Sequence, residues 1–484
     1  MRRTSLPMLL AAPLVAAAAP ALAAPPIVSH TCPNGLTVLV VEDHALPLFT
    51  VEIAAKNGSM TEPPEYNGLS HLYEHMFFKA NKAIPSQEAY LARIRELGIQ
   101  FNGTTNTERV NYYFTTTSDH FGDAMVFMRD AIVTPIFDEK ELTRERVVVT
   151  GEMDRNEASP YYHFGKAIDA KVWWKYPTYK DPLGLRKTVL EATAKKMRTI
   201  QERYYVPNNS VLVLTGDVKA ADVFAQADKL YAGWQKAEDP FKKHPLVTHP
   251  PIKKSEVVVV EQPVQSFSGN ITFHGPSTVG KSVDLTYAAD LLSIAIGEPS
   301  SKFQKDLVDS GACVEASMSW YTQMNTGPIS VRFEAAPDKI DACVKAIFAE
   351  LPKMKEPSYL SDAELKNAAH RIEVDQAAER ERPSAYAHSI TFWWTSAGLD
   401  YYNNYVDNVK KATQADIARY LDTFVLGKTF VFGALVSPEM TKAGFDQNHF
   451  EALAGLPKSP PAPAKKPAAK PPAKPAAPAK KGSK

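Results

Sequence analysis

The chain has 484 residues, of which 44% are hydrophobic and 23% are charged, and its formal net charge is +1. This length exceeds that of one compact domain, and the composition is that of a globular protein, which excludes fibrous, collagen-like and wholly disordered chains. The near-neutral charge argues against a nucleic-acid binder, because such proteins carry a basic excess. The charge is unevenly distributed along the chain. Without Arg2, Arg3 and the eight lysines from Lys458 onward, the rest of the chain has a formal net charge of −9.

The N-terminal segment has the form of a secretory signal peptide. Arg2 and Arg3 precede an apolar run that is shorter than the roughly 20 residues needed to span a bilayer. A small-x-small cleavage site ends at Ala23, so we expect residues 1–23 to be removed and the mature chain to be periplasmic or secreted.

The body of the chain predicts two similar domains. Residues 24–236 and 255–456 are separated by a proline-containing polar linker at 237–254. Residues 457–484 are rich in Pro, Ala and Lys, and we expect them to be disordered. This basic tail is either an arm that contacts an anionic envelope or an acidic partner, or a solvated spacer.

Both domains begin with a pair of strands and close with a helix followed by a strand. The predicted elements of the first domain are strands 36–42 and 48–56, helix 199–205 and strand 210–215. Those of the second are strands 255–261 and 266–274, helices 283–296, 362–378 and 414–424, and strand 429–435. The shared order predicts an α+β fold made of two duplicated domains.

A metal-binding motif follows the first strand pair. Residues three and four positions apart share a helix face, so His71, Glu74 and His75 project together. Two imidazoles one turn apart can chelate one ion, and the carboxylate can accept a proton from water that the ion activates. Zinc suits this donor set and needs no redox partner. The alternative is a helix with two unrelated histidines.

The third ligand has to come from another segment. Glu152 lies in a stretch that predicts a helix over 146–157, and Glu145 lies two helical turns earlier on the same face. Such a helix could offer one carboxylate to the metal and the other to the free N–H of a metal-binding imidazole. Alternatively, Glu145 is a surface charge, and periodicity does not decide between these readings.

The motif and its spacing resemble those of a known family. H-x-x-E-H is the inverted form of the H-E-x-x-H zinc peptidase motif, and over residues 30–435 the chain resembles the pitrilysin and insulinase family, which includes the mitochondrial processing peptidases. The spacing is the most specific feature, because 69 residues separate His75 from Glu145 and six separate Glu145 from Glu152.

The resemblance implies a role for each of these residues. It implies one zinc ion per chain, held by His71, His75 and Glu152, with Glu74 as general base. Glu145 would hydrogen-bond to one of the metal ligands.

Residues 101–105 and 111–114 resemble the substrate-binding edge strand of the family. The resemblance therefore places Asn102, Gly103 and Thr104 on a strand that pairs with the substrate backbone. It also implies that each domain is a mostly antiparallel sheet with helices packed on it, forming half of a clam shell. The enclosed chamber would favour peptides and unfolded segments over folded proteins.

The second domain departs from the pattern of active family members. Its helix 283–296 carries no metal ligands. Active members have an Arg and, seven residues on, a Tyr that help to bind substrate, and this chain has Leu307 and Val314 there. The departure predicts a heterodimer with a homologous chain that carries the Arg/Tyr pair. Otherwise we expect a homodimer in which one of three other residues has taken over: Lys302, Tyr321 or Arg332.

These observations favour an exported zinc metalloendopeptidase that cleaves peptides in a dimeric chamber. Two alternatives are a non-catalytic or partner-dependent assembly subunit and a peptide-binding module without cleavage. The odd number of cysteines (Cys32, Cys313 and Cys343) leaves at least one thiol unpaired and excludes a disulfide framework.

Overall fold

The computed structural model of the chain describes residues 26–458. The predicted signal peptide and almost all of the predicted tail lie outside the described residues. Within 26–458, no helix is both long enough and apolar enough to cross a membrane.

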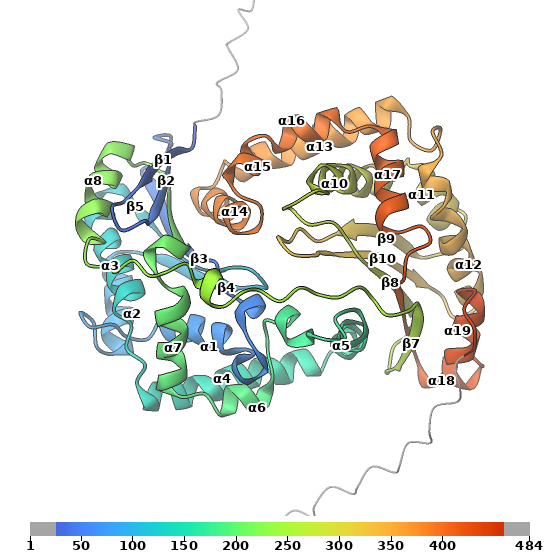
Figure 1. Cartoon of the computed structure of the whole chain (residues 1–484), viewed down its shortest axis with the longest axis horizontal. Coiled ribbons are helices and arrows are strands. Elements are labelled where there is room, and N and C mark those ends of the chain that lie inside the picture. The colour runs from blue at the N-terminus through green and yellow to red at the C-terminus, as the bar shows by residue number, and fades with distance from the viewer. Residues whose placement is uncertain (1–25, 459–484) are drawn as a thin grey trace, which may run out of the picture.

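The described residues form two halves, each with one sheet and a set of helices (Figure 1). The first half contains β1 (Val28–Thr31), β2 (Thr37–Glu42), β3 (Leu48–Ala55), α1 (Leu69–Phe77), α2 (Gln87–Glu96), β4 (Gln100–Thr105), β5 (Val110–Thr117), α3 (Phe121–Val133), α4 (Glu139–Glu157), α5 (Pro160–Val172), α6 (Arg186–Leu190), α7 (Ala194–Tyr204), β6 (Ser210–Gly216), α8 (Ala220–Leu230) and α9 (Pro240–Lys243). The second half contains β7 (Glu256–Glu261), β8 (Phe267–His274), α10 (Val283–Gly297), α11 (Lys302–Gln304), β9 (Glu315–Trp320), β10 (Pro328–Ala335), α12 (Ile340–Glu350), α13 (Asp362–Glu379), α14 (Pro383–Ser396), α15 (Leu399–Asn403), α16 (Tyr405–Lys411), α17 (Gln414–Phe424), β11 (Val431–Val436), α18 (Pro438–Lys442) and α19 (Gln447–Leu453).

The two sheets share one strand order. The first runs β1-β2-β6-β3-β5-β4, and the second runs β7-β11-β8-β10-β9. When β1 is set aside, every strand of the first sheet has a counterpart at the same place in the second. The parallel pairs β2–β6 and β7–β11 correspond as well, and the other pairings are antiparallel. The predicted α+β fold of two duplicated domains is confirmed.

Each half contributes one helix to the sheet of the other. In β2, Val38 and Val40 belong to the core that contains α1, α3 and α7, whereas Leu39 and Val41 pack with residues of α14 from the second half. In return, α5 of the first half packs on β11 of the second, and its residue Ile168 lies in an apolar cluster with residues of that strand. Burial on both faces explains why the central strands read as continuous apolar runs. The exchange holds the two halves together (Figure 1).

Some predicted elements differ from the observed ones at their ends. The helix predicted over 146–157 begins at Glu139, because the Asp138 carboxylate accepts hydrogen bonds from the backbone N–H groups of Lys140 and Glu141 and so caps it earlier. The predicted linker at 237–254 contains the short helix α9 and otherwise crosses between the halves without regular structure (Figure 1).

The cysteines divide into one disulfide and one thiol. Cys313 precedes β9 and is bonded to Cys343 of α12. Cys32, directly after β1, is buried and unpaired.

A buried polar network links α14 to the first sheet. Glu52 of β3 accepts a hydrogen bond from Asn111 at 2.9 Å. Arg109 donates hydrogen bonds to the backbone carbonyl of His388 at 2.7 Å and to the Thr391 hydroxyl at 2.8 Å. Burial raises the pKa of Glu52 from 4.5 to about 7, although the positive charge of Arg109 acts to lower it.

This network predicts a pH effect on stability. The folded protein retains a proton on Glu52 that the unfolded chain releases above pH 4.5, so the contribution of Glu52 to stability is lost as the pH rises from about 4.5 to 7. In Glu52→Gln this loss, on the order of 3 kcal/mol, should be absent. Urea unfolding of both proteins at pH 5 and pH 8 measures it, and parallel pH dependences would contradict the assignment.

Candidate metal centre

The helix α1 carries the histidine motif and is anchored at its start. Gly68 precedes it with φ 89°, and a Cβ there would lie 2.9 Å from the Cα of Gly184. The buried carboxylate of Glu62 accepts hydrogen bonds from the backbone N–H groups of Gly68 at 2.7 Å and Ser70 at 2.5 Å. An acidic group at this end also suits the helix dipole. Glu62 therefore fixes the helix from which His71, Glu74 and His75 project.

The helix α4 packs against α1 and brings two carboxylates to it. Glu145 and Glu152 lie two turns apart on α4, as expected. Glu145 is 5% exposed, so the surface-charge interpretation is wrong for it. Its carboxylate accepts the Nδ1–H of His75 at 3.1 Å and pairs with Lys79 at 2.7 Å.

The structure gathers His71, His75 and Glu152 around one point. The Nε2 atoms of His71 and His75 lie 3.3 Å apart. The Oε2 of Glu152 lies 3.5 Å from the Nε2 of His71 and 3.6 Å from the Nε2 of His75. A tetrahedral zinc ion bound at about 2.1 Å separates its ligands by about 3.4 Å. The three donor atoms therefore fit zinc without rearrangement of the backbone.

The electrostatics of this group suit a cation. Burial lowers the pKa of His71 to about 4, so its imidazole is neutral and offers a lone pair at neutral pH. Burial acts to lower the pKa of His75 as well, but the overall effect is a raised pKa. The hydrogen bond to Glu145 and the negative charges of Glu152 and Glu74 outweigh the effect of burial. The Nδ1–H of His75 points to Glu145, which leaves its Nε2 directed toward Glu152.

Glu74 lies between the histidine pair and the edge strand β4. Its Oε2 accepts a hydrogen bond from the Thr105 hydroxyl at 2.7 Å. Burial raises its pKa, which favours proton uptake, whereas the Thr105 bond acts in the opposite direction. Gly103 is the point of closest approach, because a Cβ there would lie 2.8 Å from the Glu74 Cγ. The absence of a side chain at Gly103 lets the strand pass directly over Glu74.

The strand β4 is the free edge of the first sheet, as expected for 101–105. It pairs only with β5, and Asn102 is exposed. Thr104 and Asn102 line a cavity of about 700 Å3 that also borders α14 of the second half. An extended chain could therefore add to β4 with one face toward Glu74 and the other toward this cavity.

The second half offers no equivalent of the histidine motif on α10. Asp290 lies there instead, half-buried, and accepts a hydrogen bond from Tyr405 at 2.8 Å. Leu307 is buried in the core of the second half, and Val314 is exposed just before β9.

The three substitute candidates differ in where they lie. Lys302 pairs with Asp306 within its own half at 2.6 Å. Arg332 lines a cavity of about 410 Å3 together with Tyr161 of α5. Tyr321 is close enough to Arg109 of the first half for that charge to act on its phenol, whose pKa burial raises.

Three residues that contribute to the site are not among those predicted from the sequence: Thr105, Lys79 and Glu62. Thr105 has a usable signal, because it lies two residues after Gly103 and so faces the same side of the strand. Lys79 lies four residues after His75, at helical spacing. Glu62 has no periodic relation to the motif, and only the fold brings it to the start of α1.

The comparisons with protein families match both halves of the chain. Residues 37–181 match the model described as insulinase (peptidase family M16), and residues 191–372 match the model described as the M16 peptidase inactive domain. All the residues of the candidate metal centre fall within the first match.

Individual proteins are similar over most of the chain. A protein of Arabidopsis thaliana, described as a probable mitochondrial-processing peptidase subunit beta, is 25% identical over 78% of this chain and 72% of its own length. The zinc protease PqqE of Helicobacter pylori is 25% identical over 72% of this chain and 78% of its own.

Solved structures share the fold. A protease from Helicobacter pylori superposes with a TM-score of 0.77 at 22% identity, over 85% of this chain and all of its own. The periplasmic protease PqqL of Escherichia coli superposes with a TM-score of 0.71 at 16% identity, over 89% of this chain and 50% of its own.

Proposed function

Since the chain belongs to the pitrilysin and insulinase family of zinc metallopeptidases (peptidase family M16), we propose that it is an exported endopeptidase that cleaves peptides and unfolded segments. The observation that carries this proposal is the cluster of three donor atoms beside Glu74. Their separations of 3.3 to 3.6 Å suit one zinc ion. The basic start and cleavage site of the leader support export to the periplasm or beyond the cell.

The residues of this chain divide the chemistry between them. His71, His75 and Glu152 would hold zinc, and Glu145 fixes the orientation of the His75 ring. Bound there, zinc would supply the Lewis acidity that activates water and polarises the scissile carbonyl. Glu74 accepts the proton of the attacking water and passes it to the leaving amine. Its raised pKa brings it closer to the working pH of a general base.

The substrate adds to the sheet as a strand beside β4. The backbone of Asn102, Gly103 and Thr104 would supply the hydrogen bonds, which do not depend on substrate sequence. The cavity beside Asn102 and Thr104 would receive substrate side chains that point away from Glu74. This mode of binding requires an extended substrate, which peptides and unfolded segments supply.

The proposal is tested by zinc content together with turnover of quenched peptides. The purified protein should contain zinc. Combined with its partner chain, it should cleave a peptide mixture, lose cleavage with a chelator and regain it when zinc is restored. Mass spectrometry of the products would give the cleavage sites. A zinc-loaded protein that cuts no peptide under any condition, with or without a partner, would refute the endopeptidase assignment.

Gly103→Ala should lower turnover while zinc is retained. The added methyl group would lie 2.8 Å from the Glu74 Cγ, so either the strand or the general base has to move. Misplacement of this kind costs roughly 10-fold or more in rate. Gly233→Ala is the matched control, because nothing lies within 4 Å of a Cβ there. Equal peptide turnover in the two variants would show that the close approach is not needed.

The substitutions at Leu307 and Val314 support a dimer with a related partner. The buried Leu307 offers no group to bind a peptide carbonyl, and neither does the exposed Val314. We therefore infer a heterodimer whose second chain carries the Arg/Tyr pair. A homodimer is the alternative, and in it we favour Tyr321 as the substitute. The charge of Arg109, which lines the cavity beside Asn102 and Thr104, acts on its phenol.

The isolated chain, loaded with zinc, should then cleave test peptides poorly. Substrate that is not held in position loses on the order of 100-fold in rate even when the metal site is intact. Adding the homologous exported chain should restore turnover. Efficient, chelator-sensitive cleavage by the isolated chain, unchanged by cell extract, would rule the partner out.

A non-catalytic assembly subunit is the second candidate function. The observation that favours it is the loss of the Arg/Tyr pair. A scaffold, however, has no use for two half-buried histidines and three carboxylates on one helix pair, since buried polar groups are costly. Zinc binding without turnover in the presence of the partner would favour this candidate.

A further inference from the structure

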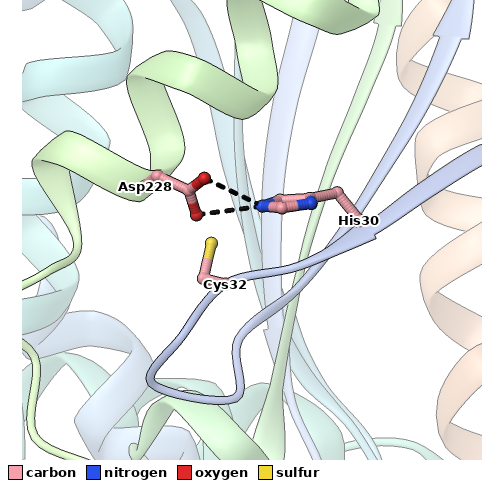
Figure 2. A group of neighbouring side chains, drawn as sticks. All are labelled: His30, Cys32 and Asp228. Carbon is pink, nitrogen blue, oxygen red and sulfur yellow. Dashed lines mark hydrogen bonds and ion pairs between the residues drawn. The ribbon is translucent and has the colours of Figure 1, made fainter.

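A second group of side chains of the types that bind metals lies on the outer edge of the first half, away from the histidine motif. It consists of His30 on β1, Cys32 directly after β1 and Asp228 on α8 (Figure 2). The Nε2 of His30 lies 2.9 and 3.0 Å from the two oxygens of Asp228. One donor atom from each residue can be chosen so that all three lie within 4.8 Å of one another. No step of the proposed function uses them.

The backbone around this group is well defined. His30 and Cys32 are two positions apart, so their side chains leave the edge of the sheet on the same side. The turn after β1 is closed by hydrogen bonds from the N–H of Cys32 to the carbonyl of Leu36 at 2.9 Å and from the N–H of Gly35 to the carbonyl of Cys32 at 2.8 Å. Figure 2 shows the Cys32 sulfur directed toward the Asp228 carboxylate.

We propose that His30, Cys32 and Asp228 form a second zinc site, with water as the fourth ligand. Imidazole nitrogen, thiolate sulfur and carboxylate oxygen are the three donor types that zinc takes in proteins. The combination of a thiolate with an imidazole disfavours magnesium and calcium, which prefer oxygen ligands. The chain would then bind two zinc ions rather than the single ion that the sequence predicts.

The geometry requires only side-chain movement. Ligands of one zinc ion lie about 3.3 to 3.8 Å apart, so donors that are now up to 4.8 Å apart must close by up to about 1.5 Å. The His30 and Asp228 donors, now 2.9 Å apart, must open slightly. The side chains of His30 and Asp228 are 31% and 40% exposed, which leaves room for them to rotate when the ion replaces the hydrogen bond between them, and gives the ion a route from solvent. Cys32 is buried and stays in place.

The arrangement of polar groups at this site also suits a cation. The Asp228 carboxylate already pairs with His30 at 2.9 Å, and the Cys32 sulfur points toward the same carboxylate (Figure 2). A zinc ion would displace the proton from Cys32 and release it to solvent, as thiolate ligation requires. The bound ion would tie β1, the first described strand, to α8.

Cobalt(II) as a spectroscopic substitute for zinc tests this site independently of peptidase activity. The site on α1 contains no sulfur, and the other two cysteines are in the disulfide, so a thiolate-to-cobalt charge-transfer band can come only from Cys32. The full-length protein should show this band, and added zinc should abolish it. The band should persist in His71→Ala, which disables the other site.

Three variants and one control make the test specific. Cys32→Ser should abolish the band, and His30→Ala and Asp228→Asn should weaken cobalt binding at least tenfold. His44→Ala is the matched control, because His44 forms a similar pair with Asp217 at 2.7 Å but has no cysteine beside it. The site is refuted if protein with a titratable Cys32 thiol shows no band, or if Asp228→Asn binds cobalt as the unchanged protein does.

Discussion

Replacing Glu74 by Gln is expected to lower peptide turnover by roughly 100-fold or more while zinc remains bound. The amide has the shape of the carboxylate and can still accept the hydrogen bond that Thr105 donates at 2.7 Å, so α1 and β4 should keep their positions. It cannot accept a proton from the attacking water. Turnover of a quenched peptide, measured alongside zinc content, separates the loss of the base from the loss of the metal.

The matched control is Glu88→Gln on α2, an exposed position in the same half. It makes the same chemical change without touching the site, so its turnover should equal that of the unchanged protein. Near-normal turnover in Glu74→Gln would remove Glu74 from the mechanism. Loss of zinc in that variant would instead assign it a role in metal binding.

Replacing His71 by Ala is expected to empty the zinc site on α1 and to abolish cleavage. The change removes one of three protein ligands, and the remaining pair, His75 and Glu152, cannot hold the ion in a site that needs three. The experiment is best made in a Cys32→Ser background, so that zinc at the second proposed site does not enter the count. Metal analysis should then fall from one zinc per chain to nearly none.

The control for this variant is His370→Ala on α13, whose side chain is 74% exposed and pairs only with nearby Glu373. Zinc content should be unchanged there. Undiminished zinc in His71→Ala would refute the ligand assignment, whatever the turnover shows. The two variants thus test the metal and the base separately.

Local periodicity in the sequence determined which side chains could act together. The spacing of His71, Glu74 and His75 places them on one helix face whatever surrounds that helix, and the seven-residue spacing of Glu145 and Glu152 does the same on α4. The repeated order of strands and helices likewise predicted the duplicated α+β fold, since strand and helix periodicities are local properties.

The tertiary structure decided how these faces meet. Contact between α1 and α4 depends on packing across 70 positions of the chain, and it shows that Glu145 is buried and paired with Lys79. The passage of Gly103 over Glu74 depends on where an edge strand ends up in the sheet. Periodicity carries no information on such distant contacts, because they are set by the packing of whole elements.

The same reason explains what the sequence could not suggest at all. His30 and Asp228 lie 198 positions apart, and only the packing of α8 against the outer strands brings them together beside Cys32. The exchange of α5 and α14 between the halves is also a consequence of tertiary packing, because an apolar helix face does not specify which sheet it will cover. Helical spacing therefore showed that His71, Glu74 and His75 act together, whereas only the family resemblance brought Glu152 to them, and neither pointed to His30, Cys32 and Asp228.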